Sequence, residues 1–244
     1  MSKYVASRIF SSLADDPRPW VLSRTLRSDN PADLNGELRG RASFRLLNNN
    51  TRNTADGLRE LLYREEGDMP GVGGGMAGAA GLRWTKKYIW RLTPWPFLME
   101  EEDSVRELPM EQTNGGRLSV WFVKAQKPVS DSTSGAEDTM HEADYIFHGL
   151  DIIQFDSTDA DESCSQVSNA TIPSPPPPAP VREPNTQVVI ARGQHLCVND
   201  RYQTVYAFRM GNDPPGRILS WSSRHLIRGP KKRQDIVNLY SRDD

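Results

Sequence analysis

The sequence predicts an all-β protein, an antiparallel sandwich or barrel, on three observations. Apolar and polar residues alternate with a period of two in about ten segments of the chain. Gly, Pro and Asn residues separate these segments, as they do between strands that are joined by turns. The residues after 186 supply only about four such segments, which alone would leave open sheet edges. We therefore expect one sheet, in which the final strands close onto the strand that begins at Trp20.

The alternation can be followed along the chain from Trp20. Trp20, Leu22 and Leu26 share one side of the first segment. In the next segment, LRGRASFRL, the apolar residues face one way and the arginines the other. The remaining strands are expected at 58–66, 83–92, 117–124, 145–155, 187–191, 195–210, 217–228 and 235–242.

Other segments interrupt this pattern. Residues 1–18 are expected to form a short amphipathic helix packed on the fold, although a mitochondrial presequence has similar features. The glycine-rich residues 71–81 and the acidic, serine-rich residues 126–142 are expected to be loops. Residues 156–186 contain SPPPPAP and are expected to form a long disordered loop within a single domain that spans 1–244.

Composition excludes several classes of protein. The net charge is −2 over 244 residues, so no overall electrostatic attraction to nucleic acid is expected. Mean hydropathy is −0.63 and no apolar run is long enough for a membrane helix, so no membrane partner is expected. Cys164 and Cys197 cannot form a disulfide framework, which favours a reducing, cytoplasmic location.

Familiar catalytic and metal motifs find little support. Gly73-x-Gly75-x-x-Gly78 lacks the strand and helix of a dinucleotide site and is interpreted as a flexible loop. No HxH, HExxH or CxxC spacing indicates a metal site, and no GxSxG sequence indicates a serine nucleophile. Cys197 with His195 as its base is possible chemistry, but a small buried cysteine is the commoner situation.

Ionisable residues within strands are the better candidates for a site, because a charge in a strand is costly unless it is paired or used. His148 has apolar neighbours on both sides, so it is either a hydrogen-bonded core residue or a cavity residue. His195 is placed at the start of a strand, near Asp200 and Tyr202. Lys86 lies among aromatic residues, where it either holds an anionic group or points outward. Lys231 follows a Gly-Pro turn that suits an anionic ligand or is simply solvated.

Seven motifs in order resemble a family of small uncharacterised fungal and bacterial proteins with the calycin-like barrel of lipocalins and nitrobindins. They are Trp20-x-Leu22-x-Arg24, GRASF, LLYREEG, YIW, FHGL, HLCVNDRY and RGPKKRQDIVNLYSR. The resemblance implies a closed barrel of eight to ten strands around a cavity. The residues that it marks are Arg24, Tyr63, Glu65, Tyr88, His148, His195, Cys197, Asp200, Tyr202, Gly229, Pro230, Lys231 and Tyr240. Arg233-Gln234-Asp235 departs from the family, which has an acid and an aromatic residue there.

We expect the interior to bind a small, hydrophobic organic molecule that carries a polar or anionic group. If the protein is an enzyme, it is a cyclase or isomerase of fungal secondary metabolism that uses no cofactor. In that hypothesis His148 and His195 transfer protons, and Glu65 and Asp200 orient them. The ligand-binding candidates are Arg24, Tyr63, Lys86, Tyr88, Trp90, Tyr202, Lys231 and Tyr240.

Two alternatives remain open. One is haem binding by His148 or His195, as in a nitrobindin. The other is a scaffold whose proline-rich residues 173–180 bind an SH3- or WW-type partner.

Overall fold

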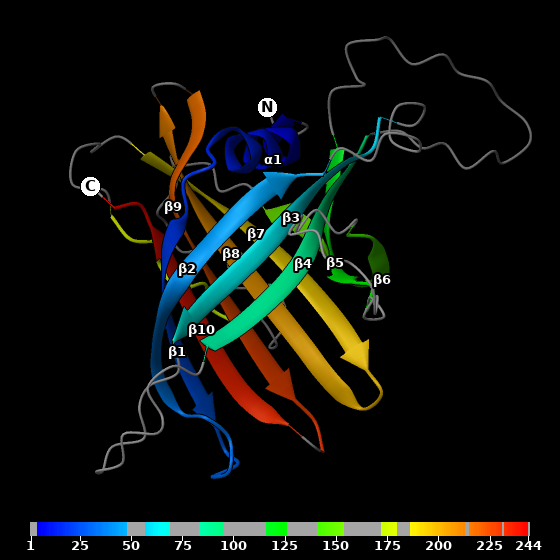
Figure 1. Ribbon diagram of the computed structural model, residues 1–244, viewed down its shortest axis with the longest axis vertical. Helices are drawn as coiled ribbons and strands as arrows, with labels where there is room; N and C mark the ends of the chain where they lie inside the picture. The colour runs from blue at the N-terminus through cyan, green and yellow to red at the C-terminus, as the bar shows by residue number, and fades with distance from the viewer. Residues whose placement is uncertain are drawn as a thin grey trace, which may run out of the picture.

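A closed β-barrel with one helix across its end forms the protein (Figure 1). The computed structural model describes residues 4–47, 57–68, 83–94, 116–125, 141–153, 172–179, 186–212, 215–230 and 232–243. The elements in these ranges are α1 (Val5–Asp15), β1 (Trp20–Ser28), β2 (Gly36–Leu46), β3 (Arg59–Asp68), β4 (Arg83–Pro94), β5 (Gly116–Val123), β6 (Ala143–Ile153), β7 (Thr186–Cys197), β8 (Asp200–Asn212), β9 (Pro215–Arg228) and β10 (Arg233–Ser241). The expected loops at 71–81 and 126–140 lie outside the described residues.

The strands follow one another around the ring, and every pairing is antiparallel. β1 pairs with β10, which places Arg24 opposite Asn238 and closes the sheet. The prediction of one antiparallel barrel of eight to ten strands with a short N-terminal helix is therefore confirmed. A sandwich is excluded because the ring is continuous.

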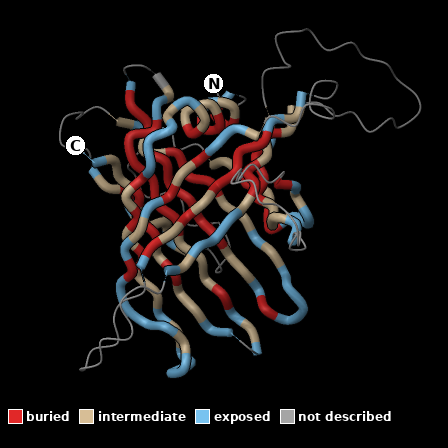
Figure 2. Tube along the Cα trace, in the orientation of Figure 1, coloured by how far each residue is buried: buried red, intermediate tan, exposed pale blue. Residues whose placement is uncertain are grey.

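Helix α1 closes one end of the barrel. Its apolar stripe, with Ile9, Phe10 and Leu13 fully buried, lies against residues of β9, β5, β2 and β4. Buried positions concentrate around this end of the molecule, whereas the opposite hairpins are mostly exposed (Figure 2). Buried apolar side chains of α1 and of these strands thus form one core cluster at this end of the barrel.

The β7–β8 hairpin differs from the sequence-based expectation. Residues 187–191 and 195–210 were expected as two strands, but β7 continues to Cys197 and the turn falls at Val198 and Asn199. His195 therefore lies near the end of β7, not at the start of a strand, and pairs with Tyr202 across the hairpin. Val198 has φ = 57° and is 81% exposed, so a β-branched residue occupies a left-handed position that usually takes Gly or Asn.

Part of the proline-rich segment is ordered, which corrects the expectation of disorder for those residues. Residues 172–179 lie against the outer surface of the barrel, and Ile172 packs on a small apolar cluster of Ile190, Val205 and Ala207. Pro177 is buried. The neighbouring residues 156–171 and 180–185 lie outside the described residues.

Candidate ligand-binding site

The interior of the barrel contains a cavity of about 290 Å³ away from α1. This volume lies at the lower end of the ~300–1,000 Å³ typical of small-molecule pockets. Most of the predicted site residues line it: Arg24, Tyr63, Glu65, Lys86, Tyr88, Trp90, His195, Tyr202 and Tyr240. The other lining residues are Val120, Phe122, Tyr145, Phe147, Cys197, Tyr206, Trp221, Ser223, His225, Ile227, Lys232, Gln234, Ile236 and Asn238.

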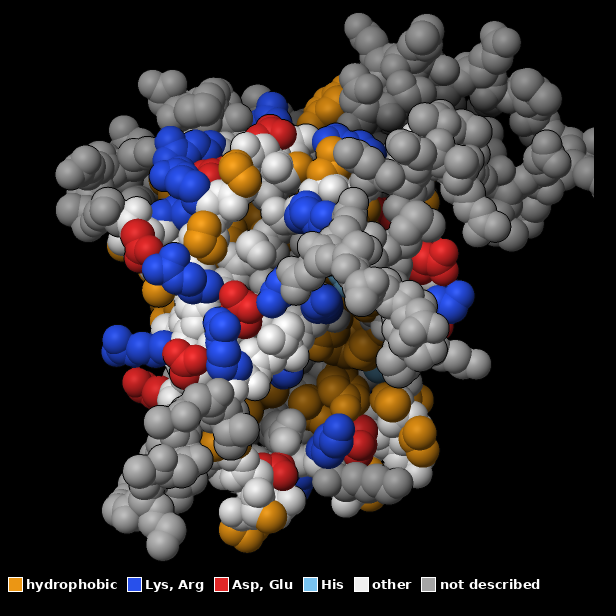
Figure 3. All heavy atoms as spheres, viewed as in Figure 1, with side chains coloured by type: hydrophobic (Ala, Val, Ile, Leu, Met, Phe, Trp, Pro, Cys, Tyr) orange, Lys and Arg blue, Asp and Glu red, His pale blue; other side chains and the backbone are white. Residues whose placement is uncertain are grey.

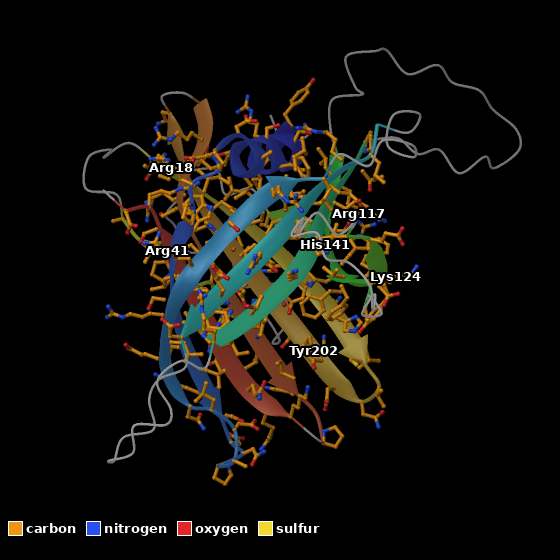
Figure 4. The ribbon with its side chains drawn as sticks, in the orientation of Figure 1. Arg18, Arg41, Arg117, Lys124, His141 and Tyr202 are labelled. Atoms are coloured by element: carbon orange, nitrogen blue, oxygen red, sulfur yellow. The ribbon has the colours of Figure 1, made fainter. Side chains whose placement is uncertain are left out.

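In the part of the chain that the structure describes, the sheet is incomplete beside the first residues of β4 and the last residues of β7. The ladder between β4 and β5 begins only at Tyr88, so Arg83–Lys87 have no partner on that side among the described residues. The ladder between β6 and β7 ends at Arg192, so β7 likewise extends beyond it. Hydrophobic side chains are visible in this part of the surface below the centre of Figure 3, and Tyr202 lies in the same half of the barrel (Figure 4).

A buried ion pair crosses the cavity wall between β1 and β3. Arg24 Nη2 donates to both carboxylate oxygens of Glu65, at 2.7 and 2.8 Å, and the two side chains are only 6% and 3% exposed. Tyr63 donates to Glu65 at 2.7 Å, and the Tyr63 and Tyr240 hydroxyls lie 2.9 Å apart. Because the Tyr63 hydroxyl donates its hydrogen to Glu65, it accepts a hydrogen bond from the Tyr240 hydroxyl.

These contacts fix the ionisation of the groups. Burial is the largest effect and disfavours the charged guanidinium of Arg24, but the charge and hydrogen bonds of Glu65, together with Tyr240 and Tyr63, raise the Arg24 pKa. Burial, followed by the negative charge of Glu65, raises the pKa of both Tyr63 and Tyr240. At neutral pH the wall therefore presents a cation, a carboxylate and two protonated phenols.

A second set of polar side chains continues this network toward β9. Arg24 Nε donates to Asn238 at 2.7 Å, and Asn238 donates to Ser223 at 2.9 Å. Ser223 and Thr204 contact the two ring nitrogens of His225, at 3.2 and 3.1 Å. Burial, followed by the nearby positive charges, holds the His225 pKa well below its usual value, so this imidazole is neutral.

Lys86 is the charged residue that this network leaves out. It lies directly across the β3–β4 ladder from Glu65, whose oxygens are taken by Arg24 and Tyr63. Among the described residues Lys86 has no hydrogen bond or ion pair. Its side chain faces the cavity, where water can reach it, while the surrounding protein and then the charge of Arg24 lower its pKa. The interior placement resolves the alternative of an outward-pointing lysine.

Aromatic rings form most of the remaining wall. Tyr240 stacks on Trp221, with ring centroids 3.5 Å apart and planes at 2°. Tyr88 stacks on Phe147 at 5.9 Å, and Phe122 lies edge-on to Phe147 at 5.0 Å. A flat or largely apolar guest therefore finds aromatic faces beside the polar network.

His148 lies behind this wall and does not line the cavity. A bulge between β5 and β6 turns both His148 and Phe147 toward the interior, and His148 Nε2 lies 3.1 Å from the Tyr206 hydroxyl. A Cβ on Gly193 would fall on the His148 ring, so only glycine leaves room for it. Burial lowers the His148 pKa to about 3. Of the two roles left open by the sequence, that of a hydrogen-bonded core residue is observed.

The other predicted residues are less central. Asp200 is buried in the β7–β8 hairpin beside Gly229 and does not line the cavity, so its assigned orienting role toward a bound molecule lacks a contact. His195 and Cys197 line the cavity, and Cys197 is exposed, which corrects the expectation of a buried cysteine. Lys231 lies outside the described residues, although its neighbour Lys232 lines the cavity.

Several lining residues escaped prediction. Trp221, Ser223, His225 and Ile227 occupy one phase of β9, and Gln234, Ile236 and Asn238 occupy the same phase of β10 as Tyr240. Tyr240 was marked by the resemblance, and extending the period-two pattern from it along β9 and β10 is the signal that could have found these residues. Within the described ranges, no group of three or more His, Cys, Asp or Glu residues is arranged to hold a metal ion. Nor is any described helix long and apolar enough to span a membrane.

Comparison with known proteins adds one finding. A family model described as a family of unknown function (DUF6314) matches residues 180–242. The match includes β7 to β10, and so the strands that carry His195, His225 and Tyr240. No curated protein and no solved structure matches the chain.

Proposed function

We propose that the barrel binds a small, largely aromatic or apolar organic molecule with an acidic group, and that Lys86 holds this group. The charges of the cavity support the proposal. Arg24, Lys86 and Lys232 are cationic lining residues, whereas Glu65 is the one carboxylate among them. Since Glu65 is paired with Arg24, positive charge remains for an anionic guest.

The observation that carries this proposal is that Lys86 lacks a partner inside an aromatic cavity. Lys86 is exposed, so water hydrates its ammonium group when no ligand is bound, and a ligand that displaces this water must supply an opposite charge or hydrogen-bond acceptors. The described residues supply neither, because the Glu65 oxygens already accept three hydrogen bonds. A carboxylate, enolate or sulfonate on the ligand would fill that position.

Two dyes that share a ring skeleton test the proposal. The anionic dye 8-anilinonaphthalene-1-sulfonate should bind more tightly than uncharged N-phenyl-1-naphthylamine, which lacks only the sulfonate. Lys86→Met should weaken binding of the anionic dye about tenfold. This change is equivalent to ~1.4 kcal/mol, as expected for the loss of one charge-assisted hydrogen bond. The same substitution should leave the affinity for the neutral dye unchanged.

The matched control is Lys87→Met, because Lys87 is the next residue of β4, points to the outer face and does not line the cavity. This variant should bind both dyes as the wild type does. Equal loss of both dyes in Lys86→Met, or equal effects of the two variants, would refute the role of Lys86. Failure of both dyes to bind would refute the binding function itself.

Proton transfer to the bound molecule is a second candidate, and it corresponds to the cyclase or isomerase hypothesis. The Tyr240–Tyr63–Glu65 chain supports it, since burial keeps the Tyr240 phenol protonated and its hydroxyl can turn from Tyr63 to donate to a carbonyl oxygen of the ligand. His195 is the histidine that lines the cavity, whereas His148 is held neutral behind Tyr206. Deuterium uptake from D2O into 2-tetralone, followed by NMR, should be faster with the wild type than with Tyr240→Phe. No acceleration over buffer would argue against catalysis.

The finer predictions stay open. The calycin-like relationship, the fungal setting and the cytoplasmic location belong to the resemblance and the composition. Haem binding by His148 or His195 is checked by a Soret band after incubation with haemin. The absence of that band would remove the alternative.

A further inference from the structure

We propose that the outer face of β8 and β9 is a recognition site for proline-rich peptides, and that residues 172–179 of the chain occupy it. This site is separate from the interior cavity, because its residues point to the opposite side of the same strands. We call these eight residues the strap.

The strap is held through its backbone carbonyls. Ser222 donates to the Pro175 carbonyl at 2.6 Å, and Ser220 donates to the Pro178 carbonyl. Arg209 donates through Nη2 to Pro177 and through Nε to Pro178, both at 3.2 Å. Three outward-facing polar residues, one on β8 and two on β9, thus bind three proline carbonyls.

Arg209 is positioned for this purpose. Its third nitrogen, Nη1, donates to the Thr186 hydroxyl at 2.8 Å, which fixes the plane of the guanidinium. It has no ion pair with a carboxylate among the described residues. All of its recorded donors are therefore directed at neutral oxygens, two of which belong to the strap.

The chemistry of the site selects proline. A proline residue has a carbonyl acceptor but no backbone N–H. Arg209 offers only donors, and Ser220 and Ser222 donate to the strap, so proline carbonyls supply the acceptors that these groups need. An ordinary peptide would bring backbone N–H groups beside the Arg209 guanidinium, which has no acceptor, at about 1–3 kcal/mol for each N–H group that is buried without a partner.

The spacing of the contacts agrees with an extended proline helix. Such a helix has three residues per turn, so Pro175 and Pro178 face the same way. Both of them bond serines on the outer face of β9, and the residue numbers run in opposite directions along the two chains. Beside these contacts, Ile172 covers Ile190, Val205 and Ala207, of which the last two have no exposed surface.

This arrangement changes the interpretation of the proline-rich sequence. The sequence suggested a ligand for an SH3- or WW-type partner. In the structure the carbonyls of Pro175, Pro177 and Pro178 are already bonded to the barrel. The barrel itself is the proline-recognising partner, and an external proline-rich peptide would compete with the strap for the same donors.

The test uses the full-length chain with residues 172–179 replaced by eight Gly and Ser residues, which opens the site. A fluorescein-labelled peptide with the strap sequence IPSPPPPA should bind this variant in fluorescence polarisation. It should bind the wild type ten- to a hundredfold more weakly, because a tethered strap competes at an effective concentration of roughly millimolar. A peptide with alanine at every proline position should not bind.

Arg209→Ala in the opened variant should abolish binding, whereas Arg228→Ala, an exposed arginine at the far end of β9, should not. Circular dichroism establishes that each variant is folded. If the opened variant does not fold, Pro177→Gly in the wild type loosens the strap at its buried ring and should give a smaller gain in peptide binding. A folded opened variant that ignores the peptide at 1 mM, or binding that survives Arg209→Ala, would overturn the proposal.

Discussion

Replacing Arg24 with Met should unfold the barrel at a much lower urea concentration than the wild type requires. The substitution leaves the Glu65 carboxylate buried, without its two hydrogen bonds of 2.7 and 2.8 Å and with only Tyr63 as a donor. Removing one partner of a buried ion pair costs about 3–5 kcal/mol. At roughly 2–4 °C per kcal/mol for a chain of this length, the melting temperature should fall by about 6–20 °C.

A second substitution separates the loss of the pair from the loss of packing. In Arg24→Met with Glu65→Leu no charge remains buried, and Tyr63 can still bond Tyr240. Replacement of a whole buried pair by apolar residues is often neutral, so most of the lost stability should return. The two substitutions should therefore be coupled by several kcal/mol in a double-mutant cycle measured by urea denaturation.

The matched control is Arg64→Met, which removes the arginine of a much more accessible pair with Glu66 on the same strand, the side chains of which are 43% and 33% exposed. Exposed pairs contribute about 0–1 kcal/mol. Arg24→Met and Arg64→Met should thus differ by at least 2 kcal/mol. Equal effects of the two variants, or an additive double variant at positions 24 and 65, would refute this account of the polar wall.

Further predictions concern the histidine core, the hairpin turn and the helix. Burial lowers the His148 pKa to about 3 in the folded chain. Between about pH 6.5 and pH 3 the unfolded chain therefore binds a proton at this histidine that the folded chain does not bind, so the free energy of unfolding falls as the pH drops through this range. His148→Gln should remove about 2 kcal/mol of the loss between pH 7 and pH 5, and parallel urea-stability profiles would contradict this. Val198→Asn should raise stability by about 1 kcal/mol, since Asn tolerates positive φ; a lower melting temperature would count against strain at this turn. Phe10→Ala should cost about 3–5 kcal/mol in urea denaturation, and a loss under 1 kcal/mol would mean that α1 is not part of the core.

The strand pattern of the sequence predicted much of the barrel and the residues that face inward. Period-two alternation put Lys86 in phase with Tyr88 and Trp90 but left open which side they face, and Arg24, Glu65 and Tyr240 were marked by the resemblance. The choice of ion-pair partner for Glu65 was not predictable in the same way. Both Arg24 and Lys86 can reach toward Glu65, and the choice depends on the width of the barrel and the position of Tyr63.

Local irregularities escaped for a related reason. The bulge that turns His148 inward inserts one residue into the alternation, and Gly149 beside it is the signal that could have indicated it. The turn at Val198 was missed because a β-branched residue disfavours positive φ. The strap was taken for a disordered loop because its composition suits disorder, and the donors that hold it, Arg209 and Ser222, lie far along the chain.

The pairing of β1 with β10 has a consequence for how the protein is made. β1 is the first strand in the sequence and β10 is the last, and the hydrogen bond between Arg24 and Asn238 spans 214 residues. On the ribosome, β1 emerges long before its partner has been synthesised, so nascent chains carry an open edge until translation has passed β10. Ring closure must then be a late and slow event. Chaperones that shield that edge during synthesis should raise the yield more than any treatment applied after release.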